Sequence, residues 1–275
     1  MRAVRALAVA GVVAAVAGCA GDGGVDRAAA AADARDGAVE VVRRAASVLA
    51  GEGVASAEVS TSMETAAGGT RVTIRGAGAY DFRAGSGLLK VVLPPDAAGE
   101  EEHRPITELL APGALYMMNR GAGVPADKWV RIDTTTLEDG NLVTGGVTDP
   151  LAAAELLRGA GAVTYVGETD LAGVPVRHYR GTADIGRAAR LAAPGSRASL
   201  AAAAKGFRAR AVPFDAYLDE EGRLRKVRHR FSFANEGPAA EVVSTTLLYG
   251  FGVPVTVRLP AERDIYTGEI EQGRA

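Results

Sequence analysis

The sequence contains a single cysteine and three histidines. One cysteine cannot form an intramolecular disulfide, and these few side chains do not supply a Cys/His zinc site. Aromatic residues make up only 5% of the chain, so a core must be built mainly from small and aliphatic side chains. The 31 Lys and Arg nearly balance the 33 Asp and Glu. The chain therefore lacks the positive field that holds a nucleic-acid backbone, and we expect no nucleic-acid binding.

The apolar run at the N-terminus is too short for a transmembrane anchor. It extends from Ala6 to Ala17, which is about 18 Å as a helix, whereas the hydrocarbon layer is about 30 Å thick. Arg2 and Arg5 precede it, and Val16-Ala17-Gly18-Cys19 ends it. A charged start, an apolar middle and a small-residue end are typical of a secretory signal. We therefore predict a signal peptide over residues 1–18.

The end of this run resembles the lipobox of bacterial lipoproteins, with Val16 where leucine is commoner. In a lipobox the cysteine receives a diacylglyceryl group and becomes the first mature residue. The resemblance implies that Cys19 is lipidated, that palmitate labels it, and that the acyl chains hold the protein on the extracytoplasmic face of the cell membrane. Residues 19–37 are small and polar and predict a flexible tether. An ordinary secretory peptide with an incidental cysteine is the alternative.

Hydrophobic residues make up 48% of the whole chain. Beyond residue 37, their pattern predicts a sheet with a few helices. Apolar residues recur at intervals of three and four over 38–49, which predicts an amphipathic helix. Alternation with a period of two predicts the strands. We expect a helix at 38–49, a helix at 151–158 with Asp149 as its N-cap, and two more helices within 184–207, broken at Pro194-Gly195. We expect strands at 55–64, 72–83, 88–93, 106–110, 114–118, 129–132, 163–169, 174–182, 212–218, 224–233, 241–249 and 253–259. In the second of these strands, Phe82 shares one face with Tyr80.

No shift in composition marks a domain boundary along this meander. We therefore expect one antiparallel α+β domain over residues 38–260, followed by a C-terminal tail over 261–275.

The usual catalytic and metal-binding patterns are missing. Gly85-Ser86-Gly87 lacks the spacing of a nucleophile elbow. His103, His178 and His229 have no carboxylate or second histidine at ligand spacing. We expect neither an enzyme nor a cofactor, although a hydrolase with a triad assembled from distant residues is a rival interpretation.

A basic stripe is predicted on one strand. Lys226, Arg228 and Arg230 alternate with Val227 and Phe231 and so share one face. A solvated outer face explains such a stripe, and contact with anionic lipid headgroups is the functional alternative.

Small residues on the inward face of the first hairpin predict spare volume. Ala57, Gly76 and Gly78 fall at inward positions. A sheet curved around them leaves a hollow unless a helix docks there or an apolar ligand enters it. Both outcomes stay open from the sequence, since a dry cavity suits an acyl chain that needs no polar partner.

Four segments resemble the actinobacterial LprG/LppX-type lipoproteins: Lys128–Asp133, Asp170–Ile185, Val212–Val227 and Tyr249–Val257. The resemblance extends over most of the mature chain. It implies a LolA-like fold, in which a single strongly curved antiparallel sheet forms a half-barrel with helices packed on its concave side. It also implies that the protein binds or moves lipids across the cell envelope without a catalytic motif or a cofactor.

Together these observations predict a membrane-anchored lipoprotein that binds a lipid or another acyl-chain ligand in an apolar cavity, for lipid transfer or envelope lipid homeostasis. A non-transporting sensor or accessory lipoprotein of the same fold, which contacts a membrane protein partner, is the alternative. Strand parity selects these candidate cavity residues: Val59, Met63, Val72, Ile74, Tyr80, Phe231 and Phe233.

Overall fold

The computed structural model describes residues 23–51, 55–67, 70–94, 104–121, 123–143, 145, 147–233 and 240–268. The chain divides into two compact units, Met1–Ala34 and Arg35–Ala275. The sheet and all helices after the first belong to the second unit.

Helices and strands follow one another in the order that the periodicity predicts, with one exception described below. The helices are α1 (Gly23–Leu49), α2 (Pro150–Leu156), α3 (Ile185–Leu191) and α4 (Pro194–Gly206), with short 3₁₀ turns η1 (Leu157–Gly159) and η2 (Glu262–Asp264). The strands are β1 (Ser56–Ala67), β2 (Thr70–Asp81), β3 (Ser86–Val92), β4 (Ile106–Ala111), β5 (Ala114–Met118), β6 (Trp129–Asp133), β7 (Ala160–Leu171), β8 (Val174–Asp184), β9 (Ala211–Leu218), β10 (Leu224–Phe233) and β11 (Ala240–Tyr249).

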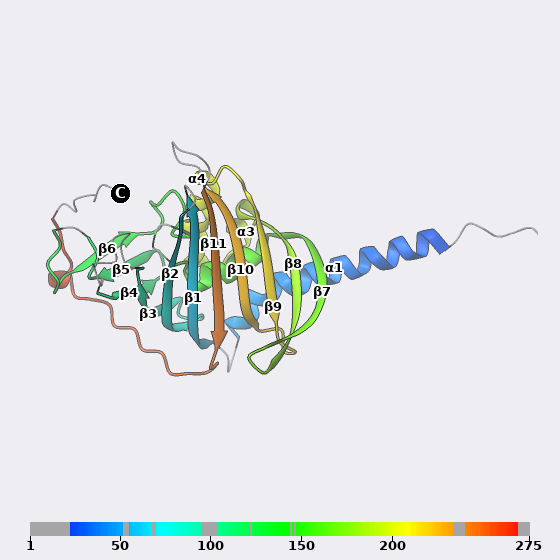
Figure 1. Ribbon diagram of the computed structural model, residues 1–275, viewed down its shortest axis with the longest axis horizontal. Helices are drawn as coiled ribbons and strands as arrows, with labels where there is room; N and C mark the ends of the chain where they lie inside the picture. The colour runs from blue at the N-terminus through cyan, green and yellow to red at the C-terminus, as the bar shows by residue number, and fades with distance from the viewer. Residues whose placement is uncertain are drawn as a thin grey trace, which may run out of the picture. The chain divides into compact units, whose positions relative to one another are not determined.

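All the strands form one open antiparallel sheet (Figure 1). The order across it is β6-β5-β4-β3-β2-β1-β11-β10-β9-β8-β7, so the last strand pairs with the first and joins two meanders. Thr61 of β1 lies opposite Thr246 of β11 and opposite Gly76 of β2. This register places Ala57, Val59 and Tyr80 on one face, which we call the inner face. The fold is therefore the single curved antiparallel α+β sheet that the sequence predicts.

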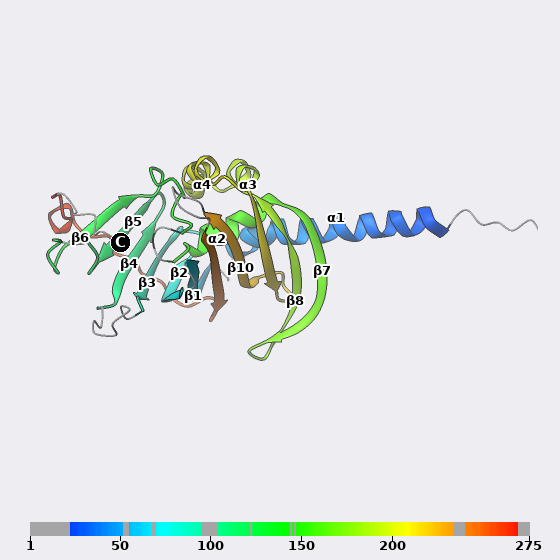
Figure 2. The same ribbon diagram turned by 45° about the horizontal axis from the view of Figure 1, so that its top comes forward.

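The helices cover the inner face of this sheet. In the second unit, α1 buries Val42, Ala45 and Leu49 completely in the same cluster as Val59 and Tyr80. Helices α3 and α4 lie side by side at one end of the strands (Figure 2), where their side chains form a second cluster with residues of β9, β10 and β11. The concave side is thus filled with protein over most of its area.

A loop, as well as a helix, fills the volume beside the small residues of the first hairpin. A Cβ added to Gly76 would lie 2.9 Å from Thr61 Cγ2 and 3.3 Å from Val147 Cγ1. Val147 belongs to the segment between β6 and α2 and is 1% exposed. The small residues therefore allow this segment to approach the sheet, and Val147 occupies the space beside Gly76.

Two segments differ from the sequence prediction. The strand expected at 253–259 is wrong: the chain turns at Gly250 and Gly252, both with positive φ, and leaves the sheet. Pro254 and Pro260 have no N–H to donate to a sheet ladder. Helix α1 begins at Gly23, within the segment 19–37 where we expect a tether, because its run of alanines has high helix propensity.

The segment after β11 packs along the other half of the sheet, where Figure 1 shows it running toward β6. Ser56 Oγ donates to Val253 O at 2.7 Å, and Tyr266 N donates to Trp129 O at 2.8 Å. Val257 and Ile265 pack against Leu109 and Tyr116. Residues up to Tyr266 are thus attached to the sheet.

Candidate pocket at the end of the sheet

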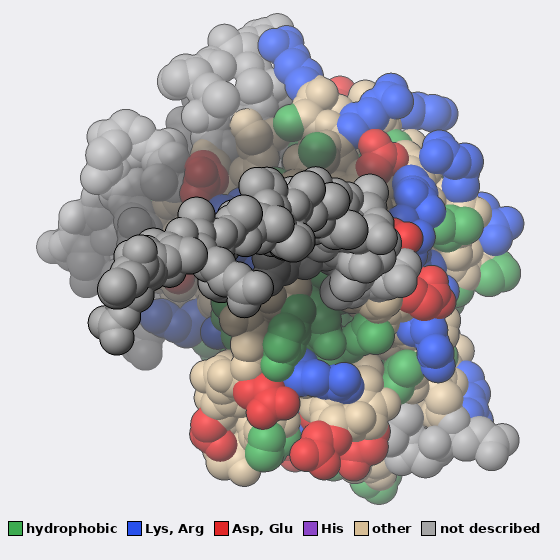
Figure 3. Space-filling model, turned by 90° about the vertical axis from the view of Figure 1, so that its right-hand side faces the viewer, with side chains coloured by type: hydrophobic (Ala, Val, Ile, Leu, Met, Phe, Trp, Pro, Cys, Tyr) green, Lys and Arg blue, Asp and Glu red, His purple; other side chains and the backbone are tan. Residues whose placement is uncertain are grey.

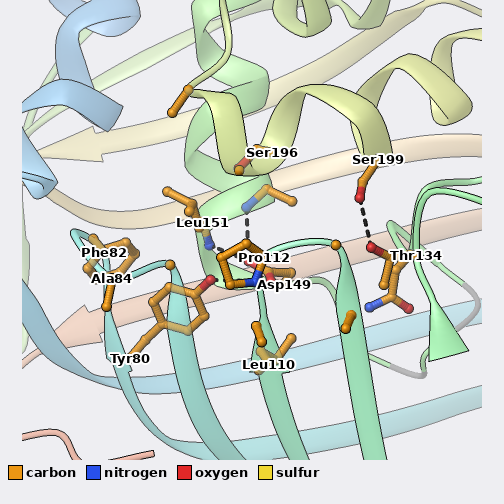
Figure 4. A pocket seen from close by; sticks show the side chains of 18 of the residues that line it. Tyr80, Phe82, Ala84, Leu110, Pro112, Thr134, Asp149, Leu151, Ser196 and Ser199 are labelled. Carbon is orange, nitrogen blue, oxygen red and sulfur yellow. Dashed lines mark hydrogen bonds between the residues drawn. The ribbon is translucent and has the colours of Figure 1, made fainter. Parts of the chain in front are cut away.

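A pocket of about 260 Å³ lies where the ends of β2, β4 and β5 meet α2 and α4. Figure 4 shows α4 on one side of it and the strands that carry Tyr80 and Leu110 on the other. The segment between β6 and α2 contributes Thr134, Gly140 and Asn141. The pocket therefore lies at the end of the sheet and not over its filled centre.

Most of the pocket wall is apolar. Phe82 and Leu110 are buried in the main core and show one side to the pocket, and Leu151 of α2 faces them. The Pro112-Gly113 turn between β4 and β5 completes this wall, and Gly113 has a positive φ of 73° that favours glycine. The remaining apolar lining comes from Ala84, Ala111, Ala114, Ala152, Ala193 and Pro194.

A tyrosine and an aspartate form the polar part of the wall. Tyr80 OH donates to Asp149 Oδ2 at 3.3 Å (Figure 4). Asp149 is the N-cap of α2, and its Oδ1 accepts from Leu151 N at 2.7 Å and Ala152 N at 3.0 Å. Burial raises the pKa of Asp149 above its usual value, although these N–H donors act in the opposite direction. Burial also raises the pKa of Tyr80.

Two further polar side chains near the pocket have unpartnered oxygens. Glu108 on β4 is 1% exposed, and its Oε1 has no hydrogen-bond partner. Burial raises the pKa of Glu108 to about 8, with Arg120 acting against the shift and Asp149 adding to it. Asn141, which lines the pocket, is also buried with an unpartnered Oδ1. This end of the sheet is rich in acceptors.

Of the seven cavity residues selected by strand parity, Tyr80 lines the pocket. Val59 is fully buried in the main core, with Ile74 packed beside it. Met63 and Phe231 are buried in the second cluster under α3 and α4. Val72 shares their face of the sheet but is 40% exposed near the end of the first hairpin. The side chain of Phe233 lies outside the described residues.

Sequence reasoning missed most of the pocket because its walls come from turns and helix starts. It placed Phe82 on the inner face but did not select it. It identified Asp149 only as a helix cap, a role that the structure confirms. The signal available was the Asp149-Pro150 start of α2, since a capping carboxylate must lie where the preceding segment meets the sheet. Nothing in the local pattern placed Pro112 or Ser196 beside it.

The basic stripe lies on the outer face of β10, as the alternation predicts. Lys226, Arg228 and Arg230 are partly exposed, and Arg228 lies opposite Asp215 of β9. Asp215 is 4% exposed and accepts from Arg180 Nε at 2.9 Å and Arg230 Nη2 at 3.1 Å.

A histidine joins the same outer-face group. His178 Nε2 lies 2.8 Å from Asp215 Oδ1. Burial acts to raise the pKa of Asp215, but its bonds to His178 and Arg180 hold it below the usual value. One carboxylate thus orients several cations, and basic side chains outnumber acidic ones in this group.

Other sequence predictions concern residues that lie outside those described, namely Cys19 and the signal segment over residues 1–18. Within the described part of the chain, no helix has the length and apolar character to cross a membrane. The same residues contain no group of three or more His, Cys, Asp or Glu side chains placed to hold a metal ion.

Solved structures resemble this fold at low sequence identity. Lipoprotein LppX of Mycobacterium tuberculosis matches with a TM-score of 0.47 and 10% identity over 81% of this chain and 99% of that chain. LprF from Mycobacterium bovis matches with a TM-score of 0.42 and 13% identity over 82% of this chain and 98% of that chain.

A putative outer membrane lipoprotein-sorting protein domain from Vibrio parahaemolyticus matches with a TM-score of 0.34 and 8% identity, over 80% of this chain and 94% of that chain. These likenesses concern the fold alone. No protein-family model and no curated protein matches the chain.

Proposed function

We propose that this chain is an extracytoplasmic, membrane-anchored lipoprotein that binds the apolar tail of a lipid in the pocket at the end of the sheet, for lipid transfer or envelope lipid homeostasis. The observation that carries the proposal is the pocket itself, whose apolar wall of Phe82, Leu110 and Leu151 surrounds about 260 Å³. This volume is just below the usual range of roughly 300–1,000 Å³ for ligand sites. It suits one alkyl chain and not several.

The proposal assigns binding and not catalysis to the pocket. Apolar walls hold an alkyl chain without polar partners, and burial of each methylene contributes about 0.8 kcal/mol. Two of the hydroxyl groups in the wall, Thr134 Oγ1 and Ser199 Oγ, hydrogen-bond each other at 2.7 Å. Neither hydroxyl has a histidine partner among the described residues.

Lipidation of Cys19 would hold the protein at the membrane. Two acyl chains bury enough methylenes for stable attachment without a spanning helix. Palmitate is expected to label the wild-type protein and not a Cys19→Ala variant. Equal labelling of the two would remove the anchor from the proposal and leave the pocket untouched.

The outer face of β10 supports contact with that membrane. Lys226, Arg228 and Arg230 would attract anionic headgroups, each contributing on the order of 1 kcal/mol near the surface. Lys226 Nζ also lies 5.1 Å from the centre of the Tyr217 ring. Reversal of the three charges is expected to weaken binding to phosphatidylglycerol vesicles and not to phosphatidylcholine vesicles.

A pocket-filling variant tests the central proposal. Gly195 lies in the first turn of α4, and a Cβ there would stand 3.4 Å from Pro112 Cβ across the pocket. Gly195→Leu is expected to occupy the pocket without loss of stability, because leucine favours the helix more than glycine does. Gly161→Leu is the matched control, since a Cβ at Gly161 has no atom within 4 Å.

The measurement is native mass spectrometry of full-length protein purified from its own membrane. Wild type and Gly161→Leu should retain lipid, and Gly195→Leu should retain severalfold less. Equal lipid in all three proteins would place the ligand elsewhere. No lipid in wild type, and no uptake from vesicles, would contradict the proposal.

One observation favours the accessory lipoprotein that binds a protein partner. Strand β7 forms an edge of the sheet and exposes Tyr165 and Val166, at 47% and 50%. Figure 3 shows this side of the molecule, with hydrophobic side chains gathered near the centre of the view. An unpaired edge strand with exposed apolar residues is suited to strand addition. Crosslinking in the native membrane through position 166 separates this function from lipid binding.

A further inference from the structure

Asp149 presents a carboxylate to the pocket without a basic partner. Its Oδ1 is engaged by the first N–H groups of α2, but Oδ2 receives only the long bond from Tyr80 OH. No lysine or arginine forms an ion pair with Asp149 in the part of the chain that the structure describes. The residue is partly exposed, and it lines the pocket. A ligand in the pocket can therefore reach this oxygen.

The polar groups around Asp149 add hydrogen-bond acceptors. Asn141 lines the same pocket, and its buried Oδ1, which lies on the side of Gly145, has no hydrogen-bond partner among the described residues. The negative charge of Asp149 adds to the effect of burial in raising the pKa of Glu108. Thr134 and Ser199 share one hydrogen bond, which uses one of their two hydroxyl protons. An incoming group that donates hydrogen bonds would find acceptors here, whereas an incoming anion would be repelled by the Asp149 carboxylate.

Arg83 is the one basic residue in the described lining, and its side chain is exposed. It follows Phe82 at the end of β2, so its charge is in contact with water, where screening is strong. The pocket thus combines an apolar wall, an electronegative interior and a basic group in water.

We infer that the ligand of this pocket is an amphiphile with a protonated amine, whose ammonium group donates to Asp149 Oδ2 while its alkyl chain packs against Phe82, Leu110 and Leu151. This inference rests on the proposed function and specifies the ligand class. A charged donor on a carboxylate oxygen gives a shorter and stronger hydrogen bond than the neutral Tyr80 OH gives. Pairing also offsets the cost of holding the carboxylate in apolar surroundings.

The experiment compares three photoreactive probes with the same eight-carbon chain, ending in an amine, an alcohol or a carboxylate. The full-length lipoprotein in phosphatidylcholine nanodiscs receives the three probes in equal amounts at pH 8. Intact mass and peptide mapping then give the labelling of the segments that contain Phe82, Leu110 and Leu151. Wild type should favour the amine over the alcohol and the alcohol over the carboxylate. The probes partition unequally into the bilayer, but this affects every variant alike, so it cancels when the amine-to-alcohol labelling ratio is compared between variants.

Asp149→Asn removes the charge and keeps the helix cap, since asparagine caps helices about as well as aspartate. The amine-to-alcohol ratio should fall about tenfold, the effect of losing one charge-assisted hydrogen bond. Asp184→Asn is the matched control, because Asp184 caps α3 through Arg187 N and does not line the pocket. Its ratio should equal that of wild type.

Three results would overturn the inference. Equal labelling by amine and alcohol, unchanged in Asp149→Asn, would show that the pocket binds alkyl chains without regard to an amine, and the proposed function would stand. Preference for the carboxylate, lost in Arg83→Gln, would identify an anionic ligand held at Arg83. If no probe labels these segments, or if Gly195→Leu is labelled as strongly as wild type, the proposed function itself is contradicted.

Discussion

The inner face of the sheet has two halves that begin from the same pattern and end differently. Under β9, β10 and β11, side chains of the sheet and of the helices α3 and α4 pack into one buried cluster, and the Phe207 and Phe231 rings lie 5.6 Å apart. Under β2, β4 and β5, the same kind of alternation leaves a pocket beside Phe82 and Leu110. Strand periodicity selects the inner face in both halves, and what packs on that face decides whether a pocket remains.

Each half also buries a titratable group with a strongly shifted pKa, and the consequences are opposite. His229 on β10 is fully buried in the filled half, and burial lowers its pKa to about 3. Glu108 on β4 is buried near the pocket, and burial raises its pKa to about 8. Both side chains are therefore neutral in the folded protein at pH 7. The filled half should lose stability in acid and the pocket half as the pH rises.

Truncation of one phenylalanine in each half gives the largest expected effect. Phe214 is fully buried, and its ring occupies the space that Gly181 leaves open. Phe214→Ala should lower the free energy of unfolding by about 3–5 kcal/mol. Phe82→Ala should cost less than this, because the Phe82 ring already borders the pocket and has fewer packing contacts to lose. Urea unfolding measures both, and equal losses would erase the distinction between the halves.

The second effect comes from Glu108. An unfolded glutamate releases its proton near pH 4.5, whereas Glu108 in the folded protein holds its proton until about pH 8. The folded state binds more protons in this window, so stability falls as pH rises, by about 3 kcal/mol at pH 7. Glu108→Gln should remove this decline. Glu168→Gln, on the exposed part of β7, is the control, and a wild-type decline that persists in Glu108→Gln would assign it to another group.

The smallest effect is expected from His229. An unfolded histidine takes up a proton near pH 6.5, and buried His229 resists protonation down to about pH 3. Here the unfolded state binds more protons, so stability falls as the pH drops below 6.5, by about 2 kcal/mol at pH 5. Between pH 4.5 and 6.5 this contribution and that of Glu108 have opposite signs and offset each other, so His229→Leu should expose the decline in stability with rising pH that comes from Glu108. Thermal unfolding between pH 4 and pH 7 measures the change.

Much of the fold could be predicted from local pattern. The two helices broken at Pro194 and the Asp149 cap of α2 were confirmed, because capping and proline effects act within one turn. The strand expected at 253–259 was wrong, since the apolar residues that alternate there pack against the outer face of β4 to β6 and the backbone does not pair with a strand. Alternation of apolar residues does not distinguish a paired strand from an extended segment that packs on a sheet.

The candidate site could be predicted only in part. Tyr80 was found because strand parity identifies inward residues. Pro112, Ser196 and Leu151 line the same pocket from three segments far apart in the sequence, so no local pattern connects them. The position of Val147 could not be predicted either. Gly76 leaves room for a side chain, but nothing in the local sequence indicates that Val147 is the residue that fills it.

The sequence by itself determined the succession of strands and helices, which side of each strand is apolar, and the basic face of β10, because backbone geometry ties these features to spacing along the chain. Only the tertiary structure decided that the middle of the curved sheet is filled and that the remaining space lies beside Asp149. The reason is that free volume depends on how distant side chains pack against one another.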